Sequence, residues 1–365
     1  QERMALVIDK NDLDEFKKYC HEENLEVTHV ATIKDNNRMI MKYKDEIICN
    51  MNYDFINSTG AKRVQDVEVV SESFPRALEV EDNVPERLYE VVKDLNVASQ
   101  KNLIELFDST VGRNTVLNPL GGKSLYNPIQ AMVAKVPVDS GNSKTVSLMS
   151  YGFNPYLMEE SQYLGGYYAV IESITKLVAT GSDRNKIRRS FQEYFEKMSS
   201  EKVWSKPLKA LLGALEASSF FKAPPIGGKD SMSGTFESIS VPPTLISFAV
   251  TTEDIENIIS PEFKGKGKIG LIRTKMTEEG LLDLEELKKN CELINREIKC
   301  GNRISASAIT SKGTLPGIYE MAVGNTGFDV KFQDTFSPKY GCFIVEYLEQ
   351  KEGILYGGDF SDEII

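Results

Sequence analysis

The sequence has little histidine. Its 365 residues include two, His21 and His29, and both lie within the first thirty positions. A nucleophile of the Cys–His–acid type needs an imidazole beside it, so one of these histidines would have to meet a cysteine from a distant part of the chain. The sequence therefore does not favour this class of catalysis, and surface or core positions account for both histidines.

Cysteines are also few and form no motif. There are five, an odd number, and no two are spaced as CxxC. This pattern indicates neither a disulfide framework nor a zinc knuckle. It fits a reducing compartment, so we expect a cytoplasmic protein. The cysteines are Cys20, Cys49, Cys291, Cys300 and Cys342.

Long apolar runs and an excess of positive charge are absent as well. No run approaches the roughly 20 apolar residues of a membrane helix, and the first residues do not resemble a signal peptide. The net charge of −11 argues against nucleic-acid binding, which needs clustered Lys and Arg. With 41% hydrophobic and 27% charged residues, we expect two or three globular domains that bind small molecules or protein.

The most distinctive stretch that is present is residues 227–234, Gly-Gly-Lys-Asp-Ser-Met-Ser-Gly. Two glycines free the backbone, and a lysine, a carboxylate and two hydroxyls follow within a few positions. Such a loop can bind a polar anion. The alternative is an ordinary turn between two strands, because a short motif does not decide between the two by itself.

The first part of the chain predicts a β-α-β-β unit. Residues 4–9 and 27–33 are expected as strands, a helix is expected from about Asp12 to Glu22, and residues 39–49 are expected as a hairpin. A unit this small has an unfinished sheet edge. We interpret it as the tail of a domain whose body is missing. Position 1 is Gln, not Met, which also indicates a piece cut from a longer chain.

The middle of the chain alternates predicted strands and helices. A strand over residues 131–139 ends at a carboxylate, Asp139, and a helix over residues 161–180 places Glu172 and Lys176 on one face. From spacing alone that pair is a solvated ion pair. Further strands are predicted at 143–152 and 245–251, and further helices at 187–198 and 206–220.

The last hundred residues begin with a basic turn, Lys-Gly-Lys-Gly-Lys at 264–268, which could bind phosphate or could be a solvated turn. A strand at 269–272 and an amphipathic helix at 283–297 follow. A strand-to-helix turn over 306–315 leads into a short helix that has Pro316 in its first turn.

Several of these pieces, taken in order, resemble phosphoribosylformylglycinamidine synthase, a large purine-pathway ligase. This family belongs to a superfamily that includes aminoimidazole ribonucleotide synthetase. The resemblance covers nearly the whole chain, and Gly-Lys-Asp-Ser-Met-Ser is its most specific segment. The matching segments are residues 1–4 with the β-α-β-β unit, 63–67, 136–139, 225–233 and 311–320.

The resemblance implies an α+β, aminoimidazole ribonucleotide synthetase-like fold, in which a β-rich amino-terminal unit precedes an α/β carboxy-terminal unit. The large enzyme has two such copies, which pair into a pseudo-twofold barrel. On that map residues 1–53 are the tail of the first copy's carboxy-terminal unit and 54–113 are a helical connector. Residues 114–260 and 261–365 are then the two units of the second copy.

The resemblance also implies an activity. The family uses ATP and Mg²⁺ to activate the amide oxygen of formylglycinamide ribonucleotide, and ammonia from glutamine replaces that oxygen. The catalytic His, the ATP-phosphate loop and the glutaminase domain belong to parts that are missing here, so we expect no catalytic residue and no activity from this chain alone. The expected contribution to the substrate cleft is Gly227, Gly228, Lys229, Asp230, Ser231 and Ser233.

Some relatives bind a non-reacting ADP with magnesium in the second copy. Asp139 and Glu172 match two of its ligands, but Lys176 and Lys312 stand where an Asn and an Asp are expected. A protonated lysine has no lone pair for a metal. We therefore expect a metal-free, structural pseudo-site in which lysine ammonium groups are the counter-charges of the two carboxylates.

Two alternatives remain open. One is a purely structural or docking module that stabilises its partner half. The other is a self-sufficient synthetase of the aminoimidazole type, which the missing His and phosphate loop weaken.

Overall fold

The computed structural model divides into two compact units, residues 1–65 and residues 66–365. Positions 1, 2 and 63 of the matching segments lie outside the described residues. The structure describes residues 3–58, 64–72, 84–107, 112–278, 280–332 and 336–361.

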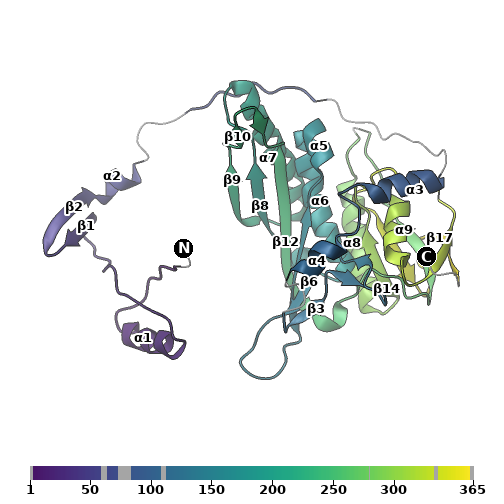
Figure 1. Cartoon of the computed structure of the whole chain (residues 1–365), viewed down its shortest axis with the longest axis horizontal. Coiled ribbons are helices and arrows are strands. Elements are labelled where there is room, and N and C mark those ends of the chain that lie inside the picture. The colour runs from purple at the N-terminus through teal and green to yellow at the C-terminus, as the bar shows by residue number, and fades with distance from the viewer. Residues whose placement is uncertain are drawn as a thin grey trace. The chain divides into compact units, whose positions relative to one another are not determined.

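The first unit contains a helix and a hairpin (Figure 1). Helix α1 spans Leu13–Glu22, and strands β1 (Arg38–Tyr43) and β2 (Glu46–Asn52) pair antiparallel. The turn residues Lys44 and Asp45 have φ angles of 46° and 69°, as the tight turns that suit hairpins require. Helix α2, Tyr53–Asn57, follows directly. The predicted helix and hairpin are confirmed.

The two other strands predicted in this unit are wrong. Residues 4–9 and 27–33 have no strand pairing, and their side chains are largely exposed. A strand is stable only when its backbone groups meet those of a neighbour. In the described part of the chain β1 and β2 pair only with each other. Within that part, residues 4–9 and 27–33 therefore have no neighbouring strand with which to form hydrogen bonds, although their sequence is apolar.

The second unit is built around a six-stranded sheet in the order β3-β6-β7-β12-β8-β9. All its pairings are antiparallel except that of β8 with β9, which is parallel. The strands are β3 (Thr115–Leu117), β6 (Met132–Lys135), β7 (Thr145–Gly152), β8 (Arg188–Tyr194), β9 (Pro225–Ser231) and β12 (Thr244–Asp254).

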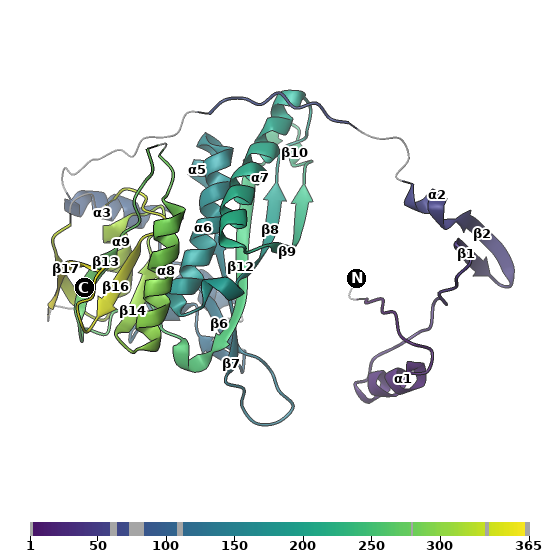
Figure 2. The ribbon, with the colours of Figure 1, turned by 180° about the vertical axis from the view of Figure 1, so that it is seen from behind.

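Two long helices lie on one face of this sheet (Figure 2). Helix α6, Gln162–Thr180, begins at the N-cap Ser161 and ends at Gly181, whose φ of 118° suits a glycine cap. It packs on α7, Glu201–Phe221, so closely that a Cβ on Gly166 would lie 2.1 Å from the Ala210 carbonyl oxygen. The predicted helices at 161–180 and 206–220 are thus confirmed.

The helix predicted at 187–198 is wrong, because this segment forms β8. Its side chains alternate between the two faces of the sheet, and Arg189 and Glu193 are buried. β8 is hydrogen-bonded on both sides, to β12 and to β9. These long-range pairings outweigh a local pattern that also fits a helix.

A second sheet of five strands has the order β14-β16-β13-β17-β15, with all pairings antiparallel. Strand β16, which lies between β14 and β13, is buried on both faces. Phe343 and Val345 contact the core shared with α6 and α8 (Leu284–Lys299), whereas Ile344 contacts the core beneath α9 (Thr314–Ala322). The strands are β13 (Lys268–Ile272), β14 (Arg303–Ala308), β15 (Gly327–Val330), β16 (Phe343–Tyr347) and β17 (Leu355–Ser361).

Short elements complete the fold. Residues 84–93 and 101–106, which fall within the expected connector, are helical, and α9 has Pro316 in its first turn. The remaining elements are α3 (Val84–Lys93), α4 (Lys101–Leu106), β4 (Leu120–Gly121), β5 (Asn127–Pro128), α5 (Pro155–Glu160), η1 (Arg184–Lys186), β10 (Thr235–Phe236), β11 (Ile239–Ser240) and η2 (Ile255–Asn257).

The basic turn at 264–268 binds a carboxylate of its own chain. Glu346, which is fully buried, accepts hydrogen bonds from the backbone N–H groups of Lys264 (2.6 Å), Lys266 (2.7 Å) and Gly267 (3.1 Å). The turn is therefore neither a simple solvated loop nor an open phosphate site, because its amide donors are already used.

Residues 66–72 run along α7 as an extended strap. The backbone N–H of Glu68 donates to the Glu201 carbonyl at 3.2 Å, and that of Val70 donates to the Ser205 hydroxyl at 3.1 Å. The strap thus advances along the first two turns of the helix.

Glu72 ends the strap at the N-terminus of α6. Its carboxylate accepts hydrogen bonds from the Ser161 hydroxyl (2.6 Å) and the Gln162 backbone N–H (3.0 Å), and it pairs with Lys209 of α7 at 2.5 Å. Burial by itself raises the pKa of this carboxyl, but these hydrogen bonds outweigh burial, so its pKa lies below the usual value. One carboxylate therefore joins the strap to both helices.

We expect Glu72→Gln to lower the free energy of unfolding by about 1 to 3 kcal/mol at pH 7, because Lys209 is left without its counter-charge. A lowered pKa stabilises the fold above the unfolded-state value and ceases to do so as pH falls through the folded-state value, so the difference from wild type should shrink below about pH 4. Urea denaturation measures both. Glu68→Gln, which removes the exposed pair with Lys202, is the control, and an equal effect of the two variants would contradict the role of Glu72.

Candidate functional site

A cavity of about 260 Å³ lies where the two sheets of the second unit meet. Its walls come from the end of β7 and the residues after it, from α6, from residues 128–130, and from the segment 307–313 that joins β14 to α9. Three of the four pseudo-site residues predicted from the sequence line it, namely Glu172, Lys176 and Lys312.

Glu172 and Lys176 form a buried ion pair. Their charged atoms are 2.6 Å apart, and the side chains are 7% and 10% exposed. Lys176 Nζ also donates to the Tyr151 carbonyl at 2.9 Å and lies 4.6 Å from the centre of the Tyr151 ring. The interpretation of this pair as solvated is therefore wrong, because α6 is covered by sheets on both sides.

Lys312 pairs with a different carboxylate from the one expected. Its ammonium group contacts Glu320 of α9, and the two side chains are 23% and 19% exposed. The prediction that Lys312 is a counter-charge for Asp139 or Glu172 is thus wrong. The α9 helix places Glu320 in the same cavity, an arrangement that nothing in the local sequence indicated.

Asp139 takes no part in the cavity. Strand β6 ends at Lys135, four residues earlier than predicted, and Asp139 is exposed and does not line the cavity. The carboxylate is therefore not held at the end of a strand, as the sequence had indicated.

These residues do not fit a magnesium-bound nucleotide. A hard divalent cation needs several oxygen ligands, but Glu172 is bound by Lys176, Glu320 is bound by Lys312, and Asp139 lies elsewhere. Within the described residues no group of three or more His, Cys, Asp or Glu side chains could hold a metal. The carboxylates that line the cavity are instead neutralised by lysines that line it too.

Polar side chains that the sequence did not single out hold the cavity walls together. Gln130 exchanges two hydrogen bonds with the backbone of Ala308, at 2.9 and 2.8 Å. Asn154 donates to the Tyr340 hydroxyl at 2.9 Å, and the Tyr340 ring stacks on Tyr168 of α6 with centroids 4.7 Å apart. Burial raises the pKa of the Tyr340 phenol, so it remains neutral.

The Gly-Gly-Lys-Asp motif lies outside this cavity. Its residues form β9, the edge strand of the six-stranded sheet, and not the predicted loop. Gly228 is needed here, because a Cβ would lie 2.9 Å from the Phe191 carbonyl oxygen. Lys229 lies across from Gln192 on β8, with its Nζ 5.1 Å from the centre of the Tyr194 ring. Gly227, Asp230 and Ser231 belong to the same strand, and Ser233 follows it.

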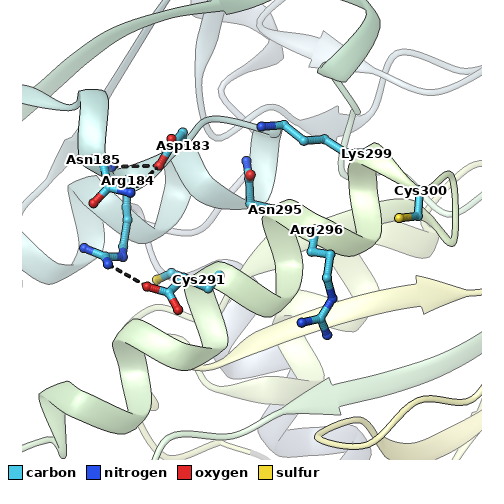
Figure 3. Close-up of a pocket in the computed structure, with 9 residues that line it drawn as sticks. Asp183, Arg184, Asn185, Cys291, Asn295, Arg296, Lys299 and Cys300 are labelled. Atoms are coloured by element: carbon cyan, nitrogen blue, oxygen red, sulfur yellow. Dashed lines mark hydrogen bonds and ion pairs between the residues drawn. The ribbon is translucent and has the colours of Figure 1, made fainter.

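A second, shallower groove of about 360 Å³ lies between η1 and α8 (Figure 3). Arg184 binds Glu292 at 2.7 Å, and Asn295 donates to the Gly181 carbonyl at 3.2 Å. Burial raises the pKa of the Cys291 thiol to about 12, so it is not a reactive thiolate. The charges of this groove are mixed and partly paired, which favours no particular ligand.

No protein-family model matches the chain. Phosphoribosylformylglycinamidine synthase subunit PurL of Thermococcus sibiricus is 25% identical, over 96% of this chain and 51% of that protein. The same subunit of Staphylococcus carnosus is 23% identical, over 96% of this chain and 49% of that protein. The chain therefore spans about half the length of these relatives.

The chain is thus similar to PurL synthase subunits along nearly its whole length. Solved structures agree with respect to the fold. PurL of Thermotoga maritima complexed with ADP has a TM-score of 0.69 and 15% identity, over 98% of this chain and 54% of that one. The same protein complexed with FGAR has a TM-score of 0.60 and 17% identity, over 89% and 47%. The predicted α+β, aminoimidazole ribonucleotide synthetase-like fold is confirmed.

We expect Lys176→Met to lower the free energy of unfolding by about 3 kcal/mol or more, because it leaves Glu172 charged and unpaired in the cavity. Adding Glu172→Gln should recover part of that loss. Denaturant unfolding of both variants tests this.

Glu105→Gln is the matched control, since it removes an exposed i, i+4 pair with Lys101. Its cost should stay below about 0.5 kcal/mol. A Lys176→Met variant as stable as this control would show that the pair is solvated.

Proposed function

We propose that this chain is part of an ATP-dependent synthase of purine biosynthesis. The complete enzyme would convert formylglycinamide ribonucleotide into formylglycinamidine ribonucleotide with ammonia derived from glutamine. The observation that carries the proposal is the similarity to PurL subunits along 96% of the chain. Structures of a fold neighbour with ATP and with FGAR support ATP and this substrate as ligands of the complete enzyme.

The rest of the enzyme would supply the reacting groups. We place the catalytic His, the ATP-phosphate loop and the Mg²⁺ in a first synthetase-like half, and the glutaminase in a separate domain. On this proposal residues 114–260 and 261–365 are the two units of the second copy. The chain alone would then be inactive, and its coverage of about half of each relative supports this view.

One face of the six-stranded sheet supports a partner half. Helices α6 and α7 lie on one face (Figures 1 and 2). Large apolar side chains of the other face are open to solvent: Met132 is 44% exposed, Met149 41% and Tyr194 37%. A broad apolar sheet face is typical of a surface that another sheet covers. We propose that the missing half packs here.

Lys229 is the residue that we propose for the substrate. It lies on this same open face. Its ammonium group can bind an anionic group while it remains over the ring of Tyr194. The other residues of the motif would approach the substrate through their backbone and hydroxyl groups, and Gly228 keeps the strand close to β8.

The cavity would serve a structural purpose. Its carboxylates are neutralised by Lys176 and Lys312, where a bound nucleotide would need a metal. We propose that these ion pairs replace the magnesium nucleotide of related enzymes. The self-paired cavity also favours the second candidate function, a module that only stabilises its partner half.

None of the helices in the described segments has the length and hydrophobicity that a membrane crossing requires. A cytoplasmic location and the absence of nucleic-acid partners remain predictions from composition.

Activity assays decide between the two candidate functions. In the complete enzyme, Lys229→Ala should lower kcat/KM for formylglycinamide ribonucleotide about 10- to 100-fold, which is the contribution of one charge-assisted hydrogen bond. Lys197→Ala, at an exposed lysine outside the motif, is the control. Equal activities of the two variants would favour the structural module, and ATP-dependent turnover by this chain alone would overturn the proposed division of labour.

The pseudo-site has a test of its own. We expect ADP with Mg²⁺ to leave the melting temperature of this chain unchanged, because the cavity offers no free metal ligands. Bound nucleotide at a hundred times its Kd would add about 2.7 kcal/mol and raise the melting temperature by several degrees. Such a rise, or a magnesium nucleotide at Glu172 in soaked crystals, would refute the metal-free site.

A further inference from the structure

Glu193 is a buried carboxyl group to which the described residues supply neither a hydrogen bond nor an ion pair. It lies in the middle of β8, is 6% exposed, and its Oε1 atom is buried with no hydrogen bond. Two other buried carboxylates in the described part of the chain have strong partners: Glu346 accepts from three backbone N–H groups, and Glu172 pairs with Lys176. An ionised carboxylate without donor or cation is strongly unfavourable in such a place.

The neighbour of Glu193 is the carboxylate of the Gly-Lys-Asp motif. Glu193 and Asp230 are register partners on the parallel strands β8 and β9, so their side chains leave the sheet on the same face. On its other side Glu193 is paired with Leu245 of β12, which is apolar.

No cation in the described surroundings compensates for the two carboxylates. The lysines on the first turns of α7 are paired elsewhere, with Glu68, Glu196 and Glu72. Arg189, on the same face of β8, is four residues away, or about 13 Å along the strand, and it donates to the Ala223 carbonyl. Lys229 leaves β9 on the opposite face, over Tyr194. The lysines concerned are Lys202, Lys206 and Lys209.

We propose that Glu193 is a neutral carboxylic acid beside Asp230 and thereby positions the motif strand β9 at the edge of the sheet. A carboxyl group that is buried beside a negative charge favours its neutral form. Burial first, and the charge of Asp230 second, raise the pKa of Glu193 to about 7. The proton would thus be present at and below neutral pH.

This arrangement makes the edge strand sensitive to pH. In the described chain β9 is held by β8 on one side only. When Glu193 loses its proton, two negative charges face each other across β8 and β9, and β9 should loosen together with Lys229. The inference does not depend on the proposed reaction, because it concerns the fold and the protonation of this chain alone. Glu193 is accordingly a positioning residue.

The first test compares the stability of wild type and Glu193→Gln from pH 5 to pH 8. A raised pKa stabilises the fold below the unfolded-state value, and this contribution is lost as pH rises through the folded-state value near 7. Relative to the variant, the folding equilibrium constant of wild type should therefore fall about a hundredfold over this range and level off above it. Glu159→Gln, at an exposed position, should show no such trend. A flat difference, or one that rises with pH, would overturn the proposal.

The second test follows β9 directly. Hydrogen exchange of the amides of residues 226–231, corrected for the intrinsic rate at each pH, should accelerate in wild type with a midpoint near pH 7. Asp230→Asn, at an exposed position, should move this midpoint down by about one pH unit, since it removes the neighbouring charge. This variant keeps the test decisive even where Glu193→Gln does not fold. A midpoint that Asp230→Asn leaves in place would also refute the influence of Asp230 on Glu193.

Discussion

The structure of the second unit depends on the burial of helix α6 between two sheets. Every residue of α6 except Tyr163 is buried, and the helix contacts β7 and β12 on one side and β14 and α8 on the other. A helix covered on all sides can carry charge only in neutralised pairs. Glu172 and Lys176, one turn apart, meet that requirement within the helix itself. Their two charges therefore cancel in the wall of the cavity beside them.

The same constraint explains the other buried carboxylates. Glu72 joins the strap to the N-terminus of α6, where backbone N–H groups that have no acceptor within the helix favour a negative charge. Glu346 closes the Lys-Gly-Lys-Gly-Lys turn by accepting three backbone hydrogen bonds. Each removes a site that would otherwise attract an anionic ligand. The exposed surface of the six-stranded sheet, by contrast, carries Lys229 on its edge strand and large apolar side chains on the face that the helices do not cover.

Prediction from sequence succeeded where the signal is local. The bounds of α6 follow from Ser161 and Gly181, and α8 begins after Asp283, whose carboxylate accepts from the Glu286 backbone N–H. It failed where the secondary structure depends on which strands pair with one another. Residues 4–9 have the composition of a strand but meet no neighbour, and β8 has a helical pattern but lies between two strands. In the candidate site the Glu172–Lys176 spacing was visible, whereas Tyr340, Gln130 and Glu320 enter from distant segments.

By itself the sequence determined the family resemblance, the positions of the capped helices and which residue types are available to neutralise charge. Only the tertiary structure decided that Lys176 is buried, that Lys312 binds Glu320, and that the glycine-rich motif is an edge strand beside Glu193. The physical reason is the range of the interactions. Caps and helix faces join groups within about four residues of one another, whereas strand pairing and the neutralisation of buried charge join groups that are adjacent only after the chain has folded.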